Sequence, residues 1–202
     1  REARDEMRLK YEIAKELGDI DEMGKYSKFD SGLDAKKIKE SKELLEAMGI
    51  AVVQAPSEGE AEASFLAKNK KAYAVASQDY DCLMFGCPLL IQNLSLSKRR
   101  KTVNGSVEVY PQIISLSEVL KELAINQEQL ICLGILVGTD YNPGGVKGLG
   151  PKKSLQIVKE YKKKEKIFDA IENEDKYSKY EIDFDWKEIY NEIEKPSVNK
   201  KV

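Results

Sequence analysis

Residues 50–76 read IAVVQAPSEGEAEASFLAKNKKAYAVA and contain two short apolar runs with a helical pattern between them. The runs, residues 50–53 and 73–76, have the length and composition of buried strands. Residues 57–68 between them are typical of a helix. A strand, a helix and a strand in this order predict a βαβ unit, in which the two strands are parallel neighbours in one sheet.

The chain after this unit predicts further strands and helices. Residues 89–91 continue the sheet, and the Asn-Gly pair at 104–105 lies between two β-prone runs, which is a strong hairpin signal. Helices are expected to begin near Ser115, where Glu118 completes a capping box, and near Asn126. The sequence therefore predicts an α/β fold.

The charge balance excludes a globally basic or acidic surface. The 202 residues include 33 Lys and Arg and 35 Asp and Glu, so the formal net charge is −2. Hydrophobic residues make up 42%, which argues against disorder. No apolar run approaches the roughly 20 residues of a membrane span, so we expect no membrane partner. Any surface that binds nucleic acid must be local.

The cysteine and histidine content narrows the chemistry further. Cys82, Cys87 and Cys132 lack the C-x-x-C spacing of zinc sites, and we interpret them as reduced thiols of an intracellular protein. The chain has no histidine, which excludes histidine-based triads and histidine-ligated metals. Carboxylates are therefore the candidate catalytic groups.

Two pairs of acids follow the two predicted strands. Glu58 and Glu60 come after the first strand, and Asp79 and Asp81 come directly after the second. The carboxyl ends of parallel strands meet at one edge of a sheet, where ligands bind in open α/β folds. Four carboxylates there repel one another unless a cation neutralises them, and oxygen ligands favour Mg²⁺ or Mn²⁺. Asp140, at the end of a predicted helix, is a candidate fifth member.

Structural roles for the same acids remain open from the pattern alone. Ser57 and Glu60 have the spacing of a capping box, and acids in a first helical turn are common. Asp79 and Asp81 have the composition of turn formers. A divalent-metal site and a set of caps and turns are therefore competing interpretations.

A glycine-rich turn precedes the next predicted helix. Residues 145–150 read GVKGLG, and Pro151 fits the first turn of a helix over 152–161. The amides at such a helix start attract phosphate, and Lys152 and Lys153 add positive charge. The alternative is an ordinary helix–helix turn with solvated lysines. Trp186, in the acidic stretch after Glu172, is interpreted as an anchor for the C-terminal tail.

Four motifs together resemble a known family. They are residues 54–61 (QAPSEGEA), 77–81 (SQDYD), 138–141 (GTDY) and 145–150 (GVKGLG). Their order and spacing are similar to those of the flap endonucleases, the XPG-type structure-specific 5′ nucleases, and the first motif is closest to archaeal members. The resemblance implies 5′ flap endonuclease and 5′-3′ exonuclease activity in DNA replication and repair. It also implies a cytoplasmic protein if the source is archaeal.

The resemblance implies a PIN-like α/β nuclease core with a parallel sheet, an N-terminal helical cap or arch and a helix-turn-helix DNA-binding element. The expected boundaries are residues 1–48 for the cap or arch, 49–135 for the nuclease core, 136–172 for the helix-hairpin-helix DNA-binding element and 173–202 for an acidic tail packed on the core.

The resemblance also assigns ligands. The family holds two Mg²⁺ ions with seven acids, of which five match Glu58, Glu60, Asp79, Asp81 and Asp140, and Mn²⁺ substitutes for Mg²⁺. A metal-activated water attacks the scissile phosphodiester. Gly148, Gly150, Lys152 and Lys153 match the element that grips duplex DNA, and K⁺ is expected at backbone carbonyls of the glycine turn.

Parts of the family pattern have no counterpart in this sequence. The first two catalytic aspartates lie upstream of the position that matches Arg1, and the C-terminal peptide that docks on the sliding clamp lies beyond Val202. We therefore interpret the chain as a fragment of a nuclease for branched DNA with a 5′ flap. The alternatives are a non-catalytic module that binds duplex DNA and a small-molecule phosphotransferase, for which the sequence offers no P-loop.

Overall fold

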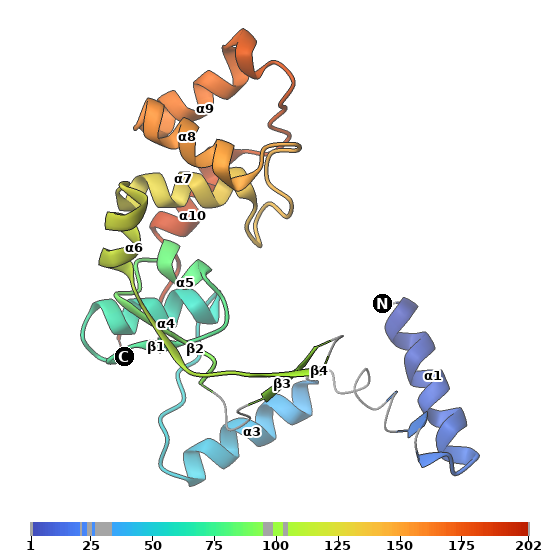
Figure 1. Ribbon diagram of the computed structural model, residues 1–202. Helices are drawn as coiled ribbons and strands as arrows, with labels where there is room; N and C mark the ends of the chain where they lie inside the picture. Colours follow the sequence, from blue (N-terminus) through green and yellow to red (C-terminus); the bar gives the residue numbers. More distant parts are fainter. Residues whose placement is uncertain are drawn as a thin grey trace. The chain divides into compact units, whose positions relative to one another are not determined.

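The computed structural model divides the chain into two compact units, residues 1–53 and 54–202 (Figure 1). It describes residues 2–20, 22–23, 26, 34–94, 99–102 and 105–201. Within these ranges, every helix is too short or too polar to cross a lipid bilayer. The three cysteines are free thiols, as the sequence predicts.

The first unit contains helices with exposed apolar side chains. Its described helices include α1 (Glu2–Glu16) and α3 (Ala35–Ala47). The Asp34 carboxylate caps α3 by accepting a hydrogen bond from the Lys37 amide, and Gly49 follows the helix with a φ of 75°, which suits a C-terminal glycine cap. No residue of α3 is buried, and Leu44 and Met48 are exposed.

The second unit contains a small mixed sheet. Its strands are β1 (Val75–Ala76), β2 (Leu89–Gln92) and β5 (Gln112–Ser115), in the order β1-β2-β5. β1 and β2 are parallel, and β2 and β5 are antiparallel. A separate antiparallel hairpin joins β3 (Arg99–Thr102) and β4 (Gly105–Glu108) where the sequence predicts one. Its turn residues, 103–104, lie outside the described ranges.

The prediction of a first strand in the βαβ unit is wrong. Residues 50–53 form no strand, and the second predicted strand is reduced to β1. A strand requires a neighbour that accepts and donates its backbone hydrogen bonds. Among the described residues β1 pairs only with β2, so the backbone groups along its other edge have no partner strand. β1 itself is only two residues long.

Most of the regular secondary structure described in the second unit is helical. Its elements are α4 (Gly59–Lys68), α5 (Asp81–Met84), α6 (Leu116–Leu123), α7 (Gln127–Val137), α8 (Pro151–Tyr161), α9 (Lys164–Asn173), the 3₁₀ turn η1 (Asp175–Tyr177) and α10 (Trp186–Glu194). Helices α7 to α10 gather at one end of this unit, and α4 and α5 lie beside the sheet (Figure 1).

The predicted helix starts are confirmed in position, but not all in chemistry. Asn126 and Gln129 form a complete capping box at the start of α7, and Pro151 begins α8. Ser115 precedes α6, yet its hydroxyl pairs with the Ser117 hydroxyl at 2.9 Å and caps no backbone amide. The predicted Ser115–Glu118 capping box is therefore wrong, because a nearer side chain competes for the serine.

Two hydrophobic cores meet at the short helix α5. The sheet core includes Cys82 and Leu83, and the helical core includes Met84 and Phe85. All four side chains are buried. Because consecutive residues of α5 anchor in two cores, the backbone that begins at Asp81 is held on both sides.

Candidate functional site

Glu58 and Glu60 lie at the N-terminal end of α4. Glu58 is the N-cap residue, but its carboxylate caps no amide of the helix, and Glu60 lies in the first turn. The Ser57 hydroxyl does not cap the helix either, since it donates to the carbonyl oxygen of Ser197 at 3.1 Å. The capping-box interpretation of Ser57 and Glu60 is therefore wrong, and both carboxylates are half-buried without a capping role.

Asp79 and Asp81 lie in the turn between β1 and α5. The Asp79 carboxylate accepts a hydrogen bond from the Asp81 amide at 2.9 Å, and the Asp79 amide donates to the Ser77 hydroxyl at 3.1 Å. Asp79 thus forms a turn, as one of the two interpretations expects. Asp81 is the first residue of α5, and both carboxylates are half-buried.

Asp140 lies in a tight loop after α7 and is exposed. The helix ends at Val137, so Asp140 is beyond its end rather than in its last turn. The Asn142 side chain fixes the loop: it accepts a hydrogen bond from the Thr139 hydroxyl at 2.7 Å and donates to the Ile135 carbonyl at 2.7 Å. Both Thr139 and Asn142 are buried.

The glycine turn supports this loop from the other side. Gly145 has a φ of 55°, and a β-carbon on it would lie 2.4 Å from the Leu136 carbonyl oxygen. Gly138 has a φ of 119°, and its β-carbon would lie 2.8 Å from the Gly145 amide nitrogen. The two backbones approach so closely that only glycine fits at both positions.

The five acids act on one another electrostatically. Burial, followed by the charges of Asp79, Asp140 and Glu58, raises the pKa of Asp81 from 3.8 to about 6. Burial also raises the pKa of Glu58, with further contributions from Asp140, Glu60 and Asp79. The structure therefore brings all five predicted acids into one electrostatic cluster, although residues 50–53 form no strand.

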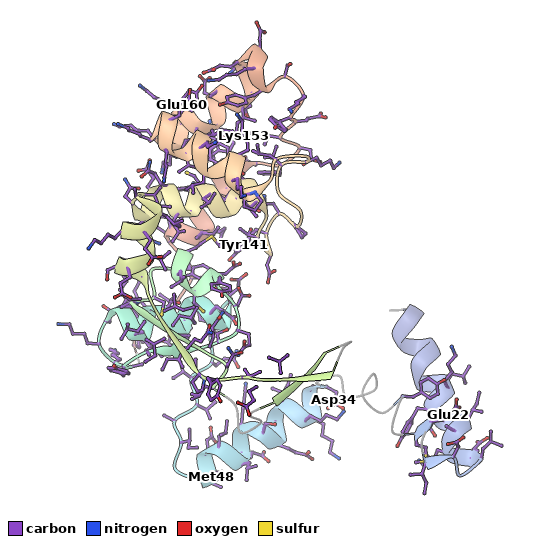
Figure 2. The ribbon with its side chains drawn as sticks, in the orientation of Figure 1. Glu22, Asp34, Met48, Tyr141, Lys153 and Glu160 are labelled. Carbon is purple, nitrogen blue, oxygen red and sulfur yellow. The ribbon has the colours of Figure 1, made fainter. Side chains whose placement is uncertain are left out.

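Tyr141 is a member of the site that sequence reasoning missed as a functional side chain. Its hydroxyl donates a hydrogen bond to the Glu58 carboxylate, which partly offsets the rise in the pKa of Glu58. Burial and the Glu58 charge raise the pKa of Tyr141 itself. Its only sequence signal is its position directly after Asp140. Figure 2 labels Tyr141 in the loop after α7.

The donor set of the cluster fits a divalent cation. Among the described residues, no lysine or arginine forms an ion pair with any of the five carboxylates. Half-buried carboxylates that repel one another bind hard cations such as Mg²⁺ through oxygen. In the described part of the chain, no three acidic side chains yet converge closely enough to hold an ion together.

The predicted phosphate-binding residues lie at the start of α8. Gly150 is the N-cap residue and supplies no side-chain cap, while Gly148 has a φ of 77°. Lys152 and Lys153 are exposed in the first turn, and the Lys153 ammonium lies 5.7 Å from the centre of the Tyr177 ring (Figure 2). An uncapped helix N-terminus with two lysines suits a phosphate group.

Comparison with known proteins gives consistent matches. The model of the XPG I-region family matches residues 49–140. Flap endonuclease 1 of Thermococcus onnurineus is 56% identical over 164 residues, which is 80% of this chain and 48% of that protein. The chain spans about half the length of the curated relatives it matches.

Solved structures match as well. The flap endonuclease-1 structure from Methanococcus jannaschii is 38% identical, with a TM-score of 0.68 over 91% of this chain and 51% of that chain. The catalytic core of Rad2 in complex with DNA substrate is 25% identical, with a TM-score of 0.68 over 83% of this chain and 58% of that chain. These matches confirm the predicted PIN-like α/β nuclease fold.

Proposed function

Because this chain is a relative of the archaeal flap endonucleases and carries an XPG I-region, we propose that the whole protein is a 5′ flap endonuclease and 5′-3′ exonuclease. Its substrate is branched DNA with a 5′ flap, in replication and repair inside the cell. The observation that carries this proposal is the cluster of Glu58, Glu60, Asp79, Asp81 and Asp140, whose charges repel one another around half-buried carboxylates.

The five carboxylates are the proposed ligands for two Mg²⁺ ions, or for Mn²⁺ in their place. Bound Mg²⁺ supplies a water of lowered pKa and positive charge for the leaving oxygen. Asp81 is held by the two cores on either side of α5, and its carboxylate accepts a hydrogen bond from the Asp140 amide. Tyr141 orients Glu58 through its hydroxyl. These contacts restrict the positions of Asp81 and Glu58, two of the five proposed ligands.

The N-terminal end of α8 and the glycine turn before it are the proposed contact with duplex DNA. The turn at Gly148 and Gly150 exposes the start of α8, where Lys152 and Lys153 add positive charge. Contacts of this kind read phosphates and no base sequence. We further propose K⁺ at the carbonyls of this turn, residues 1–48 as a cap over the single strand, and a sliding clamp as a partner of the whole protein.

Cleavage of a labelled 5′-flap duplex in Mg²⁺ tests the proposal. The proteins to compare are this chain and a version in which the upstream half of an archaeal relative is fused before Arg1. We expect the fused version to cut, and we expect Asp81→Asn in that background to lower the rate by at least about a hundredfold, as loss of a catalytic electrostatic group does. Glu122→Gln, an exposed carboxylate on α6, is the matched control and should leave the rate unchanged.

The competing function is a non-catalytic module that binds duplex DNA. It is favoured by one feature, the uncapped start of α8 with Lys152 and Lys153. If the fused protein binds the duplex but never cuts it in Mg²⁺ or Mn²⁺, the acids are structural and the module replaces the nuclease. Duplex binding that survives Lys152→Gln with Lys153→Gln contradicts the proposed grip.

A further inference from the structure

Residues 78–84, here called the aspartate segment, carry Asp79 and Asp81 but belong to no long helix or strand. β1 ends at Ala76, and α5, which begins at Asp81, is a single helical turn. A helix of this length closes too few backbone hydrogen bonds to be stable alone. The carbonyl oxygens of the aspartate segment therefore depend on donors from other elements.

Gln127, the first residue of α7, holds the end of α5. Its side-chain nitrogen donates hydrogen bonds to the carbonyl oxygens of Leu83 and Met84 at 3.0 and 2.7 Å. Its side-chain oxygen Oε1 is buried and accepts no hydrogen bond from the described residues, which is unfavourable. Turning the amide over would place this oxygen against two carbonyl oxygens. The side chain is therefore held in place by the two bonds that it donates.

Two more side chains hold the aspartate segment from other elements. The Gln92 amide, on β2, donates a hydrogen bond to the Gln78 carbonyl oxygen at 3.0 Å. The Ser64 hydroxyl, on α4, donates to the Cys82 carbonyl oxygen at 3.2 Å. Both Gln92 and Ser64 are buried. Donors on β2, α4 and α7 thus converge on one short segment of backbone.

Helix α7 contacts α5 along one side. Gly134 lies about two turns after Gln127, so the two residues share a face of α7. A β-carbon on Gly134 would overlap the Met84 sulfur, which shows that the Met84 side chain packs directly on the α7 backbone. Beyond the end of α7, the Asp140 amide donates a hydrogen bond to the Asp81 carboxylate. Both ends of α5 are therefore tied to α7 or to the loop after it.

We propose that Gln127, Gln92 and Ser64 are positioning residues of the candidate metal site. The proposal rests on the proposed function, in which Asp79 and Asp81 bind divalent ions. The three side chains supply no ligand themselves and act through the backbone on both sides of the two aspartates. Ligands whose backbone is already fixed lose less conformational freedom when the ion binds, so the donors should raise metal affinity.

Gln129, two residues along α7, offers a matched control. Its side-chain nitrogen donates to the Val158 carbonyl oxygen on α8 at 3.0 Å, and its Oε1 completes the capping box of α7. Gln129→Glu keeps the acceptor of the capping box and removes the donor to Val158. If buried amides here only stabilise the fold, changes at Gln127 and Gln129 should both lower stability and leave metal affinity unchanged.

Binding of Mn²⁺ to this chain, followed by the electron paramagnetic resonance signal of the free ion, tests the proposal. Methionine has nearly the shape of glutamine and no N–H donor, so Gln127→Met and Gln92→Met remove the hydrogen bonds with little change in packing. We expect each variant to weaken Mn²⁺ binding at least about threefold, as loss of a hydrogen bond does, and Gln129→Glu to leave it unchanged. Gln92→Met, on a different element, carries the test if Gln127→Met does not fold.

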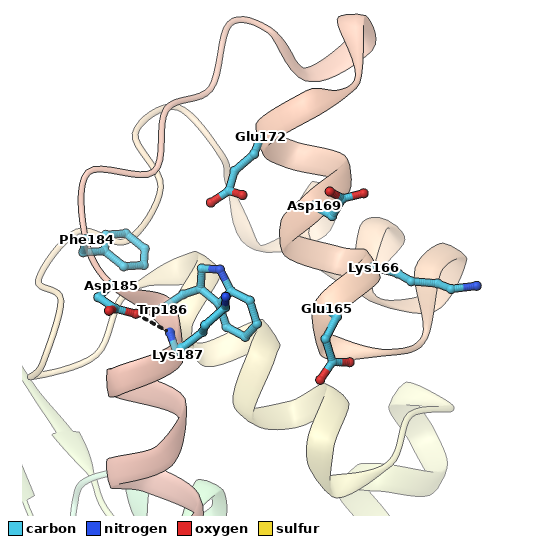
Figure 3. A pocket seen from close by; sticks show the side chains of 8 residues that line it. All are labelled: Glu165, Lys166, Asp169, Glu172, Phe184, Asp185, Trp186 and Lys187. Carbon is cyan, nitrogen blue, oxygen red and sulfur yellow. Dashed lines mark hydrogen bonds between the residues drawn. The ribbon is translucent and has the colours of Figure 1, made fainter.

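Mn²⁺ that binds elsewhere on the surface must be separated from binding at the candidate site. Glu165, Asp169 and Glu172 line a groove of about 670 Å³ between α9 and the start of α10 (Figure 3). Asp81→Asn leaves this groove intact and removes a proposed ligand, so its residual binding measures the background.

Cleavage by the fused protein supplies a second readout. Gln127→Met should raise the Mg²⁺ concentration for half-maximal cleavage at least about threefold, while the rate at saturating Mg²⁺ stays within about twofold of wild type. Unchanged Mn²⁺ affinity in both methionine variants, or an equal loss in Gln129→Glu, would overturn the inference and leave the metal site in place. A wild-type chain that binds no more Mn²⁺ than Asp81→Asn would overturn the metal site, and this inference with it.

Discussion

Among the five carboxylates of the candidate site, Asp81 is the one whose pKa is most strongly raised by burial and neighbouring charge. Its carboxylate has a pKa of about 6, against 3.8 for an ordinary aspartate, and burial is the largest cause. The charges of Asp79, Asp140 and Glu58 add to the shift. The site is therefore electrostatically strained until positive charge enters it.

The raised pKa predicts a pH dependence of stability. Because the folded carboxyl binds its proton more tightly than the unfolded one, its stabilising contribution is complete below about pH 4 and is lost as the pH rises through about 6. In metal-free buffer, wild-type protein should lose free energy of unfolding between these pH values relative to Asp81→Asn. Urea unfolding at several pH values measures the difference, and parallel pH curves for the two proteins would contradict the shift.

Gly145 gives a second prediction at this scale. An alanine there would take a φ of 55° and place its β-carbon 2.4 Å from the Leu136 carbonyl oxygen. Gly144 has a φ of 87° and nothing within 4 Å of its β-carbon position, so Gly144→Ala is the matched control for backbone strain alone. We expect Gly145→Ala to cost roughly 1–3 kcal/mol more than Gly144→Ala, as overpacked sites do.

Urea unfolding followed by Trp186 fluorescence compares the two alanine variants. Equal midpoints with equal denaturant slopes would show that the backbone around Leu136 moves aside without cost. The loop that carries Asp140 would then be less rigid than its hydrogen bonds through Asn142 indicate.

Helix α4 is the element through which the C-terminal segment reaches the candidate site. Glu62, 3% exposed, accepts a hydrogen bond through Oε2 from the Asn199 amide at 2.7 Å. Its Oε1 is buried and accepts no hydrogen bond from the described residues. Together with the bond from Ser57 to Ser197, this contact ties the segment to both sides of Glu58 and Glu60.

Removing the Glu62 carboxylate should loosen this tie. We expect Glu62→Ala to lower the free energy of unfolding by about 1–3 kcal/mol, because the Asn199 amide loses its acceptor. Glu62→Gln keeps an acceptor oxygen and should cost less. Hydrogen exchange checks the cause: the Asn199 amide should exchange faster in Glu62→Ala than in Glu122→Ala, and equal rates would refute the role of this contact.

At the scale of single elements, the sequence predicted the positions of helices better than those of strands and capping side chains. Asn126 and Pro151 are strong local signals, and both helix starts are as predicted. The failures at Ser57 and Ser115 have one physical origin, since each hydroxyl found another partner, Ser197 far along the chain in one case and Ser117 in the other. Such competition is invisible to a rule that compares residues three positions apart.

At the scale of the whole molecule, the acids lie together as predicted, whereas the sheet beside them differs from the prediction. The acids assemble although residues 50–53 form no strand, because α4, the turn before α5 and the loop after α7 bring them together. The positions of Glu58, Glu60, Asp79 and Asp81 after two predicted strands were enough to predict that these four acids lie close together. Sequence positions could not indicate Tyr141 or Asn142, whose contacts depend on how α7 packs.

Exposed side chains of opposite charge lie on the neighbouring helices α8 and α9. Lys152 and Lys153 are exposed at the start of α8, and Glu165, Asp169 and Glu172 are exposed on α9. Since the net charge of the chain is −2, long-range attraction to DNA is weak and binding should fall steeply with salt.

The most direct measurement of the central claim is a Mn²⁺ titration of the isotope-labelled chain followed by NMR. Paramagnetic broadening should appear first at the amides around Glu58, Glu60, Asp79, Asp81 and Asp140, and excess Mg²⁺ should reverse it. Asp81→Asn should reduce this broadening, and Glu122→Gln should not. Broadening that spares these five acids, or that gathers instead along α9, would contradict a divalent-metal site at α4, α5 and the loop after α7.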